Sequence, residues 1–221
     1  MKTLARVELA RLIDHTLIQP AGTRHDIARL CAEAREHGFH GVCVNGSRVE
    51  LAYALLEDTE LKVTALVGFP FGGSDADVKR YEAEAAIDQG AHEIEMVINI
   101  GRLKDGDRTY VLRELRDIAE AADERPVGVI LEVGLLTPEE KNLACELSLD
   151  SGVHFVSTGA GFRAAPTAAE VKSLREAVGE KFGVKAAGRV GDTQTALALI
   201  EAGATRLGTA EGVAIVSSLP K

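Results

Sequence analysis

The chain has 221 residues, of which 46% are hydrophobic, and this size fits one large domain. Its 25 basic and 34 acidic residues give a net charge of −9, and no cluster of Lys and Arg indicates a nucleic-acid surface. Cys31, Cys43 and Cys145 lie far apart without a CxxC spacing, so neither a zinc site nor a disulfide framework is indicated. Charged residues interrupt positions 1–12, which argues against a signal peptide or a membrane span. We therefore expect a cytoplasmic protein with no metal, no cofactor and no nucleic-acid or membrane partner.

Helical and apolar patterns alternate along the whole chain. Four helical runs end in a glycine just before an apolar run, at Gly38, Gly90, Gly152 and Gly203. A glycine accepts the left-handed conformation that ends a helix, and the chain then enters a strand. The predicted strands are 12–14, 40–44, 63–67, 93–98, 127–133, 153–157, 183–187 and 206–208. The predicted helices are 3–12, 23–37, 48–56, 75–89, 107–122, 138–151, 167–178 and 193–202.

These elements define the expected fold class. Near-continuous Val, Ile and Leu runs are typical of strands buried on both faces, as in a parallel sheet. Eight such strands alternating with helices predict a single (β/α)₈ TIM barrel over residues 1–221, with an extra helix at its N-terminus. No linker or low-complexity tract interrupts it. In such a barrel, functional residues gather at the C-terminal ends of the strands.

The stretch from His154 to Phe162 carries the most specific signal, and it reads H-F-V-S-T-G-A-G-F. It resembles the deoxyribose-phosphate aldolase family, whose members typically read F-V-K-T-S-T-G-F there and form a Schiff base on that lysine. Ser157 stands in the place of the lysine. Because a hydroxyl cannot condense with a carbonyl to an iminium, the resemblance predicts the fold but not the family's covalent chemistry.

The resemblance covers nearly the whole chain, and the departures fall at the site. Glu95 replaces the aspartate of the family's E-I-D-M-V run, and the family's paired glycines after its second lysine read Gly188-Arg189 here. Ala210-Glu211 replaces a serine pair. The matching segments are I-D-H-T-L at 13–17, V-C-V-N at 42–45, V-G-F-P at 67–70, E-I-E-M-V-I-N-I-G at 93–101, V-K-A at 184–186 and G-A-T-R-L-G-T at 203–209.

Three residues are the expected catalytic groups: Lys185, Glu95 and Ser157. A lysine inside an apolar strand must reach a pocket or pair with a carboxylate, so Lys185 is either catalytic or the partner of Glu95 or Glu132. We expect Lys185 and Glu95 to face each other across the barrel mouth. Ser157 has no activating base and is expected to bind a ligand oxygen or fill space. The expected substrate contacts are Asp14, Thr16, Cys43, Asn45, Thr158, Gly161, Gly188, Arg189 and Glu211.

The anion site of the resembled family is expected to be altered. Gly161 and Gly188 keep part of a glycine-rich phosphate cradle, but Glu211 places a carboxylate where phosphate oxygens would dock. We predict that Glu211 occupies this site itself, paired with Arg189 as an internal mimic of phosphate. The less favoured alternative makes Arg189 the phosphate ligand and turns Glu211 outward.

Three functions stay open. The first is an aldolase-type carbon–carbon lyase on a small carbonyl or sugar-like substrate, with Lys185 as a relocated Schiff-base lysine or a proton-transfer group. The second is a barrel enzyme without a covalent intermediate, such as a hydratase, cyclase or isomerase, on a non-phosphorylated substrate. The third is a non-catalytic metabolite-binding homologue. Deoxyribose 5-phosphate is expected to be a poor substrate, and a homodimer is compatible with the resemblance.

Overall fold

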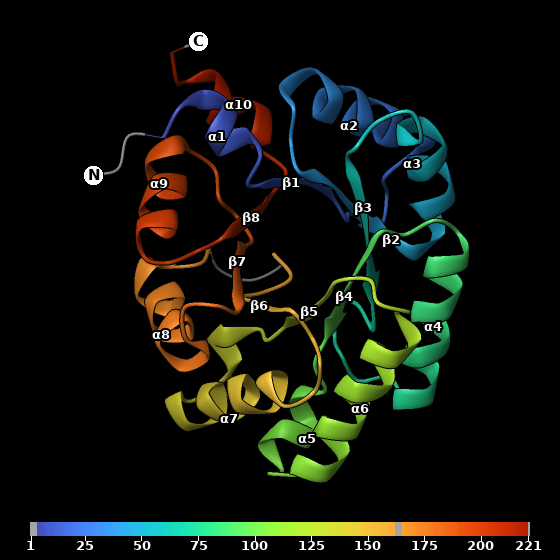
Figure 1. Ribbon diagram of the computed structural model, residues 1–221, viewed down its shortest axis with the longest axis vertical. Coiled ribbons are helices and arrows are strands. Elements are labelled where there is room, and N and C mark those ends of the chain that lie inside the picture. The colour runs from blue at the N-terminus through green and yellow to red at the C-terminus, as the bar shows by residue number, and fades with distance from the viewer. Residues whose placement is uncertain (1–3, 162–164, 221) are drawn as a thin grey trace.

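A computed structural model describes residues 4–161 and 165–220 and shows a closed barrel of eight parallel strands in the order β1 to β8. Helices surround the barrel on its outside (Figure 1). The barrel closes where Asp14 of the first strand lies opposite Gly208 of the last. The predicted (β/α)₈ fold is therefore confirmed. The strands are β1 Ile13–Leu17, β2 Gly41–Asn45, β3 Lys62–Val67, β4 Glu93–Val97, β5 Val127–Ile130, β6 Phe155–Ser157, β7 Gly183–Ala187 and β8 Arg206–Thr209.

The outer layer follows the predicted helices to within about three residues at most ends. The α-helices are α1 Arg6–Ala10, α2 Arg24–His37, α3 Val49–Leu56, α4 Ala76–Asp88, α5 Ile100–Lys104, α6 Arg108–Ala121, α7 Pro138–Leu149, α8 Ala168–Val178, α9 Thr193–Glu201 and α10 Gly212–Ser217. Helices α5 and α10 were not among the predicted helices, and neither were the 3-10 turns η1 Gly46–Arg48 and η2 Val133–Leu135. The N-terminal helix is shorter than the predicted 3–12, and position 3 lies outside the described residues.

Local chemistry accounts for many element ends. The side chains of Thr23, Thr137 and Thr167 each accept a hydrogen bond from the backbone N–H three residues on and so begin α2, α7 and α8. The four junction glycines all have a positive φ: 64° at Gly38, 99° at Gly90, 90° at Gly152 and 112° at Gly203. The helix-to-strand turns therefore form as the sequence predicts.

The strands bury both faces, but the two faces differ in chemistry. Outward residues such as Val42, Val44 and Val129 are fully buried in the large core between strands and helices. Inward residues near the mouth form a small apolar cluster of Cys43, Leu66, Val97, Ile130 and Ala160. Charged side chains from β1, β4, β7 and β8 occupy the rest of the interior. Among the described residues, every helix is too short or too polar to span a lipid bilayer.

Candidate active site

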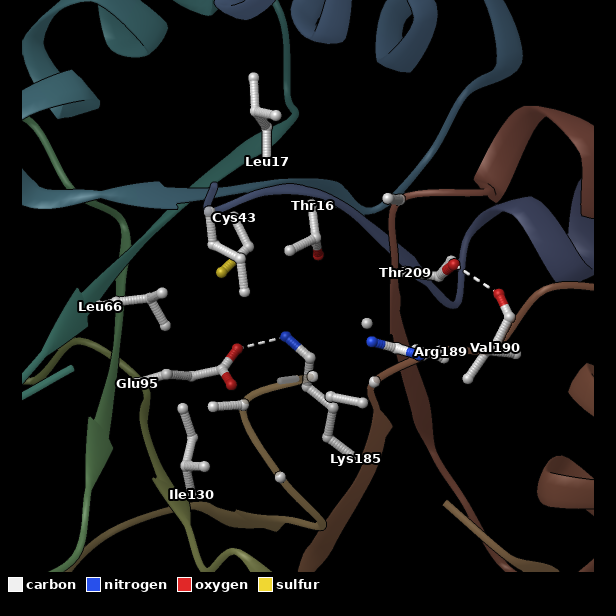
Figure 2. Close-up of a pocket in the computed structure, with 18 of the residues that line it drawn as sticks. Thr16, Leu17, Cys43, Leu66, Glu95, Ile130, Lys185, Arg189, Val190 and Thr209 are labelled. Atoms are coloured by element: carbon white, nitrogen blue, oxygen red, sulfur yellow. Dashed lines mark hydrogen bonds and ion pairs between the residues drawn. The ribbon is translucent and has the colours of Figure 1, made fainter. Parts of the chain in front are cut away.

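A cavity of about 550 Å³ opens at the C-terminal ends of the strands, where barrel enzymes carry their sites. Glu95 of β4 and Lys185 of β7 face each other there, as predicted, and Figure 2 shows the contact between them. Cys43, Leu66 and Ile130 form an apolar wall beside Glu95 (Figure 2). The cavity thus joins a charged group pair to an apolar surface, a combination typical of small-molecule sites.

Lys185 is the centre of the charged floor. Its Nζ lies 2.5 Å from Asp14 Oδ2 and donates a hydrogen bond to Glu95 Oε1, although only 1% of the residue is exposed. The lysine reaches Asp14 because β8 carries Gly208 beside it: a Cβ there would lie 2.9 Å from Lys185 Cε. Asp14 was predicted as a substrate contact, but the structure places it behind Lys185 as an ion-pair partner.

A second cation extends this cluster away from the cavity. Arg206 of β8 donates from Nε to Asp14 Oδ2 at 3.1 Å and from its two terminal nitrogens to Glu93 of β4. His40 Nε2 lies 3.3 Å from the same Glu93 carboxylate. The interior therefore holds a continuous chain of charges from Glu95 through Lys185, Asp14 and Arg206 to Glu93.

Burial and charge pull the pKa values of this cluster in different directions. Burial lowers the pKa of Lys185, but the attraction of Asp14 and Glu95 outweighs it and raises that pKa above its usual value. Burial raises the pKa of Asp14, yet Lys185 and Arg206 together hold it below its usual value. Burial also raises the pKa of Glu95, and Lys185 offsets this only in part. Lys185 is thus held as an ammonium and Asp14 as a carboxylate, whereas burial favours the neutral form of Glu95.

The total charge of the buried cluster also points to Glu95. Lys185 and Arg206 supply two positive charges, and Asp14, Glu93 and Glu95 supply three carboxylates. The five groups carry a net charge of −1 when Glu95 is ionised and are neutral when it is protonated. Because a buried net charge is costly, protonation of Glu95 would relieve the excess negative charge of these five groups.

Among the described residues, Ser157 does not line the cavity. It pairs in register with Lys185, so the two side chains share the inward face. Its Oγ is buried and has no hydrogen-bond partner in the described part of the chain. The predicted contact of Ser157 with a ligand oxygen stays a prediction, because its hydroxyl is buried and has no partner to show what it binds. His154 Nδ1 accepts a hydrogen bond from Val127 N at 3.1 Å and so is not available to Ser157 as a base.

Glu132 holds the loop that follows β6. It adopts a left-handed backbone conformation with φ 52° and ψ 57°, which ends β5 earlier than predicted. Its Oε1 accepts a hydrogen bond from Ala160 N, and Val133 N donates to Thr158 O at 2.9 Å. On the other side of this loop, Thr158 Oγ1 accepts a hydrogen bond from Ala187 N and donates one to Ala187 O, both at 3.0 Å. The cavity wall at residues 159–161 is therefore fixed from both neighbouring strands.

The other predicted substrate contacts divide into two groups. Thr16, Cys43, Gly161, Gly188, Arg189 and Glu211 line the cavity together with Lys185 and Glu95. Asn45 does not, because its Nδ2 donates to Ile18 O at 3.2 Å and so ties down the loop after β1. Thr158 lines a smaller neighbouring pocket of about 250 Å³ instead. Burial raises the pKa of the Cys43 thiol, so it is an apolar wall residue and not a nucleophile.

The predicted pairing of Arg189 with Glu211 is wrong. Both residues are exposed at the rim, and no ion pair or hydrogen bond joins Arg189 to any other described residue. Glu211 is the N-cap of α10 but makes no capping bond with its side chain. Figure 2 shows the guanidinium of Arg189 extending towards the cavity. Water competes for both exposed groups, so an ion pair between them would contribute little and nothing requires it to form.

Sequence reasoning missed Arg206 and Glu93 as structural residues of the site. It also missed that Glu132 holds the loop after β6. A signal existed for the first two. Arg206 stands two residues before Gly208, and Glu93 two before Glu95, so strand alternation places each on the inward face. The positive φ of Glu132 had no such signal, since left-handed glutamate is uncommon.

The fold and the site together define a barrel of the aldolase class. A family model described as DeoC/LacD family aldolase matches residues 9–215, so the chain belongs to this family. It is 48% identical to deoxyribose-phosphate aldolase 1 of Bacillus licheniformis over 96% of both chains. It is 46% identical to the deoxyribose-phosphate aldolase of Thermococcus gammatolerans, over 95% of this chain and 96% of that one.

Solved structures agree with this membership. The tetrameric deoxyribose phosphate aldolase of Aeropyrum pernix superimposes with a TM-score of 0.91 at 28% identity, over 97% of this chain and 92% of that one. The resemblance found in the sequence motifs is therefore confirmed at the level of the family and of the fold.

Proposed function

We propose that this protein is a carbon–carbon lyase that cleaves or forms an aldol bond in a small sugar-like carbonyl compound, with proton transfer by Glu95 and Lys185 and without a Schiff base at position 157. One observation carries the proposal: the Lys185 ammonium sits between two carboxylates at the cavity floor, while Ser157 replaces the family's lysine. Membership of the aldolase family supports the reaction class.

The chemistry balances with these two residues. The Glu95 carboxylate takes the proton of the hydroxyl that lies β to the substrate carbonyl. The carbon–carbon bond then breaks, and one fragment leaves as an aldehyde. The electron pair of the broken bond stays with the other fragment, which becomes an enolate. The Lys185 ammonium donates a hydrogen bond to the enolate oxygen, where negative charge develops. Glu95 finally returns its proton to the enolate carbon, which completes the cycle.

The raised pKa of Lys185 argues against a relocated Schiff base. Only a neutral amine attacks a carbonyl, and Asp14 and Glu95 hold Lys185 in its charged form. The same feature favours a second candidate, a hydratase, cyclase or isomerase on a non-phosphorylated substrate, because such reactions need an acid and a base but no covalent intermediate.

The test combines trapping with turnover. The protein is incubated with acetaldehyde, glycolaldehyde or dihydroxyacetone, reduced with borohydride and weighed by mass spectrometry. Aldol cleavage of deoxyribose 5-phosphate and of non-phosphorylated hydroxyaldehydes is followed by dehydrogenase-coupled release of aldehyde. We expect no reduced adduct, slow or no turnover of deoxyribose 5-phosphate, and cleavage of a non-phosphorylated compound that Glu95→Gln abolishes. The acid limb of that activity should lie above the pKa of about 4.3 for an exposed glutamate, because burial raises the pKa of Glu95.

Each contrary outcome has a distinct meaning. Brisk turnover of deoxyribose 5-phosphate with a borohydride adduct on Lys185 would establish a relocated Schiff base and overturn the proposal. Hydration or isomerisation without cleavage would select the second candidate, and binding without any turnover would make the protein a non-catalytic homologue. As a positive control, Ser157→Lys combined with Glu95→Asp, Arg189→Gly and Glu211→Ser should gain activity on deoxyribose 5-phosphate, and Ser157→Lys alone should gain little.

A further inference from the structure

One cation and one carboxylate of the buried cluster stand apart from the cavity. Arg206 of β8 donates to both oxygens of Glu93 of β4, and among the described residues neither of the two lines the cavity. Thr64 Oγ1 also donates to Glu93 Oε2 at 3.3 Å, and the Arg206 guanidinium lies 5.3 Å from the centroid of the Phe155 ring. This outer pair is therefore held in place by its own contacts and is not placed to touch a ligand in the cavity.

A single carboxylate oxygen links the outer pair to the floor of the cavity. Asp14 Oδ2 accepts from Arg206 Nε at 3.1 Å and lies 2.5 Å from Lys185 Nζ. Lys185 in turn donates to Glu95. Because Asp14 is fully buried, water and salt screen the charges on its two sides only weakly. The position and the charge of Arg206 are therefore felt at Lys185 and Glu95.

The outer pair keeps fixed charges. Burial lowers the pKa of Arg206, but the carboxylates that it binds outweigh burial and raise that pKa above its usual value. Burial raises the pKa of Glu93, but its contacts with His40 and Arg206 hold that pKa below its usual value. Burial raises the pKa of Glu95 as well, and Lys185 and Arg206 are the cations that oppose this rise. Two permanent charges thus act on a carboxyl group whose neutral form is favoured.

Other charges also surround Glu95, and they limit which residues can serve as probes. In the described part of the chain, the charged and titratable groups around it are Asp14, Cys43, Glu93, Lys185, Arg206, the rim residues Arg189 and Glu211, and His40 behind Glu93. Arg206 and Glu93 are the fixed charges among them that neither line the cavity nor contact Lys185. Their replacement therefore changes the field at Glu95 and leaves the cavity wall intact.

We propose that Arg206 and Glu93 are positioning residues, in that Arg206 holds Asp14 and the opposite charges of the outer pair set how readily Glu95 takes up a proton. Arg206 favours the carboxylate form of Glu95, and Glu93 limits this effect. The inference deepens the proposed function by giving its proton-transfer group a control outside the cavity. It rests on that function only for the role of Glu95.

Infrared titration of the intact protein tests the inference without any turnover. The C=O band of protonated carboxyl groups is recorded across pH, and the band of Glu95 is identified by its loss in Glu95→Gln. We expect Arg206→Gln to raise the midpoint of this band by about one pH unit, as for a charge roughly 10 Å away at an effective dielectric constant of about 20. Glu93→Gln should lower the midpoint by less, because Arg206 stands between Glu93 and the rest of the cluster. Arg206→Lys keeps the charge and should leave the midpoint near that of the unmodified protein.

A double variant separates charge from structure. Arg206→Gln with Glu93→Gln removes one charge of each sign, so its midpoint should lie between those of the single variants and close to that of the unmodified protein, although the ion pair is lost. Arg35 binds Asp58 through two exposed hydrogen bonds of 2.6 and 2.8 Å, and Arg35→Gln is the matched surface control that should not move the midpoint.

The direction of the two shifts decides the result. Single variants that move the midpoint in the same direction, or leave it in place, would refute the inference, because a purely structural pair predicts no opposite shifts. Should Arg206→Gln alone fail to fold, the downward shift in Glu93→Gln and its reversal in the double variant decide. Opposite shifts without cleavage of any substrate would sustain this inference and defeat the lyase proposal, whereas cleavage with an unmoved midpoint would do the reverse.

Discussion

Two lysines of this barrel are buried against glutamate, one outside the strands and one inside them. Lys79 of α4 and Glu114 of α6 have fully buried side chains 2.8 Å apart. Lys79 Nζ also donates to Val97 O at 2.8 Å, and the second oxygen of Glu114 accepts from Asn99 N at 3.1 Å. Lys185 instead lines a cavity and lies between two carboxylates.

The two pairs differ in whether their charges are balanced and their hydrogen-bonding groups are used. The Lys79 pair has one cation for one carboxylate, and backbone groups take up the remaining hydrogen bonds, so it is closed and structural. Around Lys185, Asp14 Oδ1 and Ser157 Oγ have no partner among residues 4–161 and 165–220, and the carboxylates outnumber the lysine. Burial of a charge pair is therefore not by itself a sign of function; access to a cavity and incomplete pairing are the informative features.

Lys185→Met should produce the largest effect on activity. We expect the turnover found in the cleavage assay to fall about 10³- to 10⁴-fold, at the upper end for loss of a positioned acid–base group. The fold should persist, because Arg206 still pairs with Asp14 and water from the cavity can reach the vacated space. Circular dichroism tests whether the fold persists, and steady-state kinetics measures the loss of turnover. A loss below 3-fold would remove Lys185 from the chemistry and leave it equivalent to Lys79.

Lys79→Met should show the opposite profile. It leaves Glu114 buried without its cation, which typically costs about 3–5 kcal/mol of unfolding free energy, while the kcat of the folded fraction should change little. Urea unfolding measures the loss. The double variant Lys79→Met with Glu114→Leu removes both charges and should recover most of the stability. A single variant within 1 kcal/mol of the unmodified protein would show that this pair is not the closed structural element described here.

Glu132→Ala should have the smallest of the three effects. It releases Ala160 N and loosens the cavity wall at residues 159–161, so we expect KM to rise about 10-fold, as expected for one lost charge-assisted hydrogen bond, with a smaller change in kcat. Glu132→Gln keeps an acceptor oxygen and should restore most of the KM. If the Gln variant is as impaired as the Ala variant, the carboxylate charge matters and the positioning role is wrong.

The sequence was sufficient for the fold and for the central pair of the site. Repeated glycine junctions and apolar runs predicted the eight strands, and the position of Lys185 within an apolar strand predicted its contact with Glu95. The prediction that failed concerns where long side chains end. The alternation of residues along a strand does not determine this. Arg189 and Glu211 were expected to pair as an internal mimic of phosphate, yet both stay exposed at the rim.

The buried ion pair of Lys79 and Glu114 was also missed, although the sequence pattern of the two helices could have indicated it. Lys79 lies in the stripe of small buried residues Ala76, Ala83 and Ala86, and Glu114 lies in the apolar stripe of the neighbouring helix. A lone charge in each of two adjacent stripes predicts a buried partner, but single-residue reasoning considers each helix separately.

The ion pair between Asp14 and Arg206 joins residues that are 192 positions apart in the chain. Asp14 belongs to the first strand, whereas both of its cationic partners belong to the last two. A chain synthesised only as far as β6 therefore contains three inward acidic groups, Asp14, Glu93 and Glu95, without either cation. Like charges that lie close together repel one another, and the two cations that offset them come only with β7 and β8. The charged floor of the cavity is therefore complete only when the last two strands are in place.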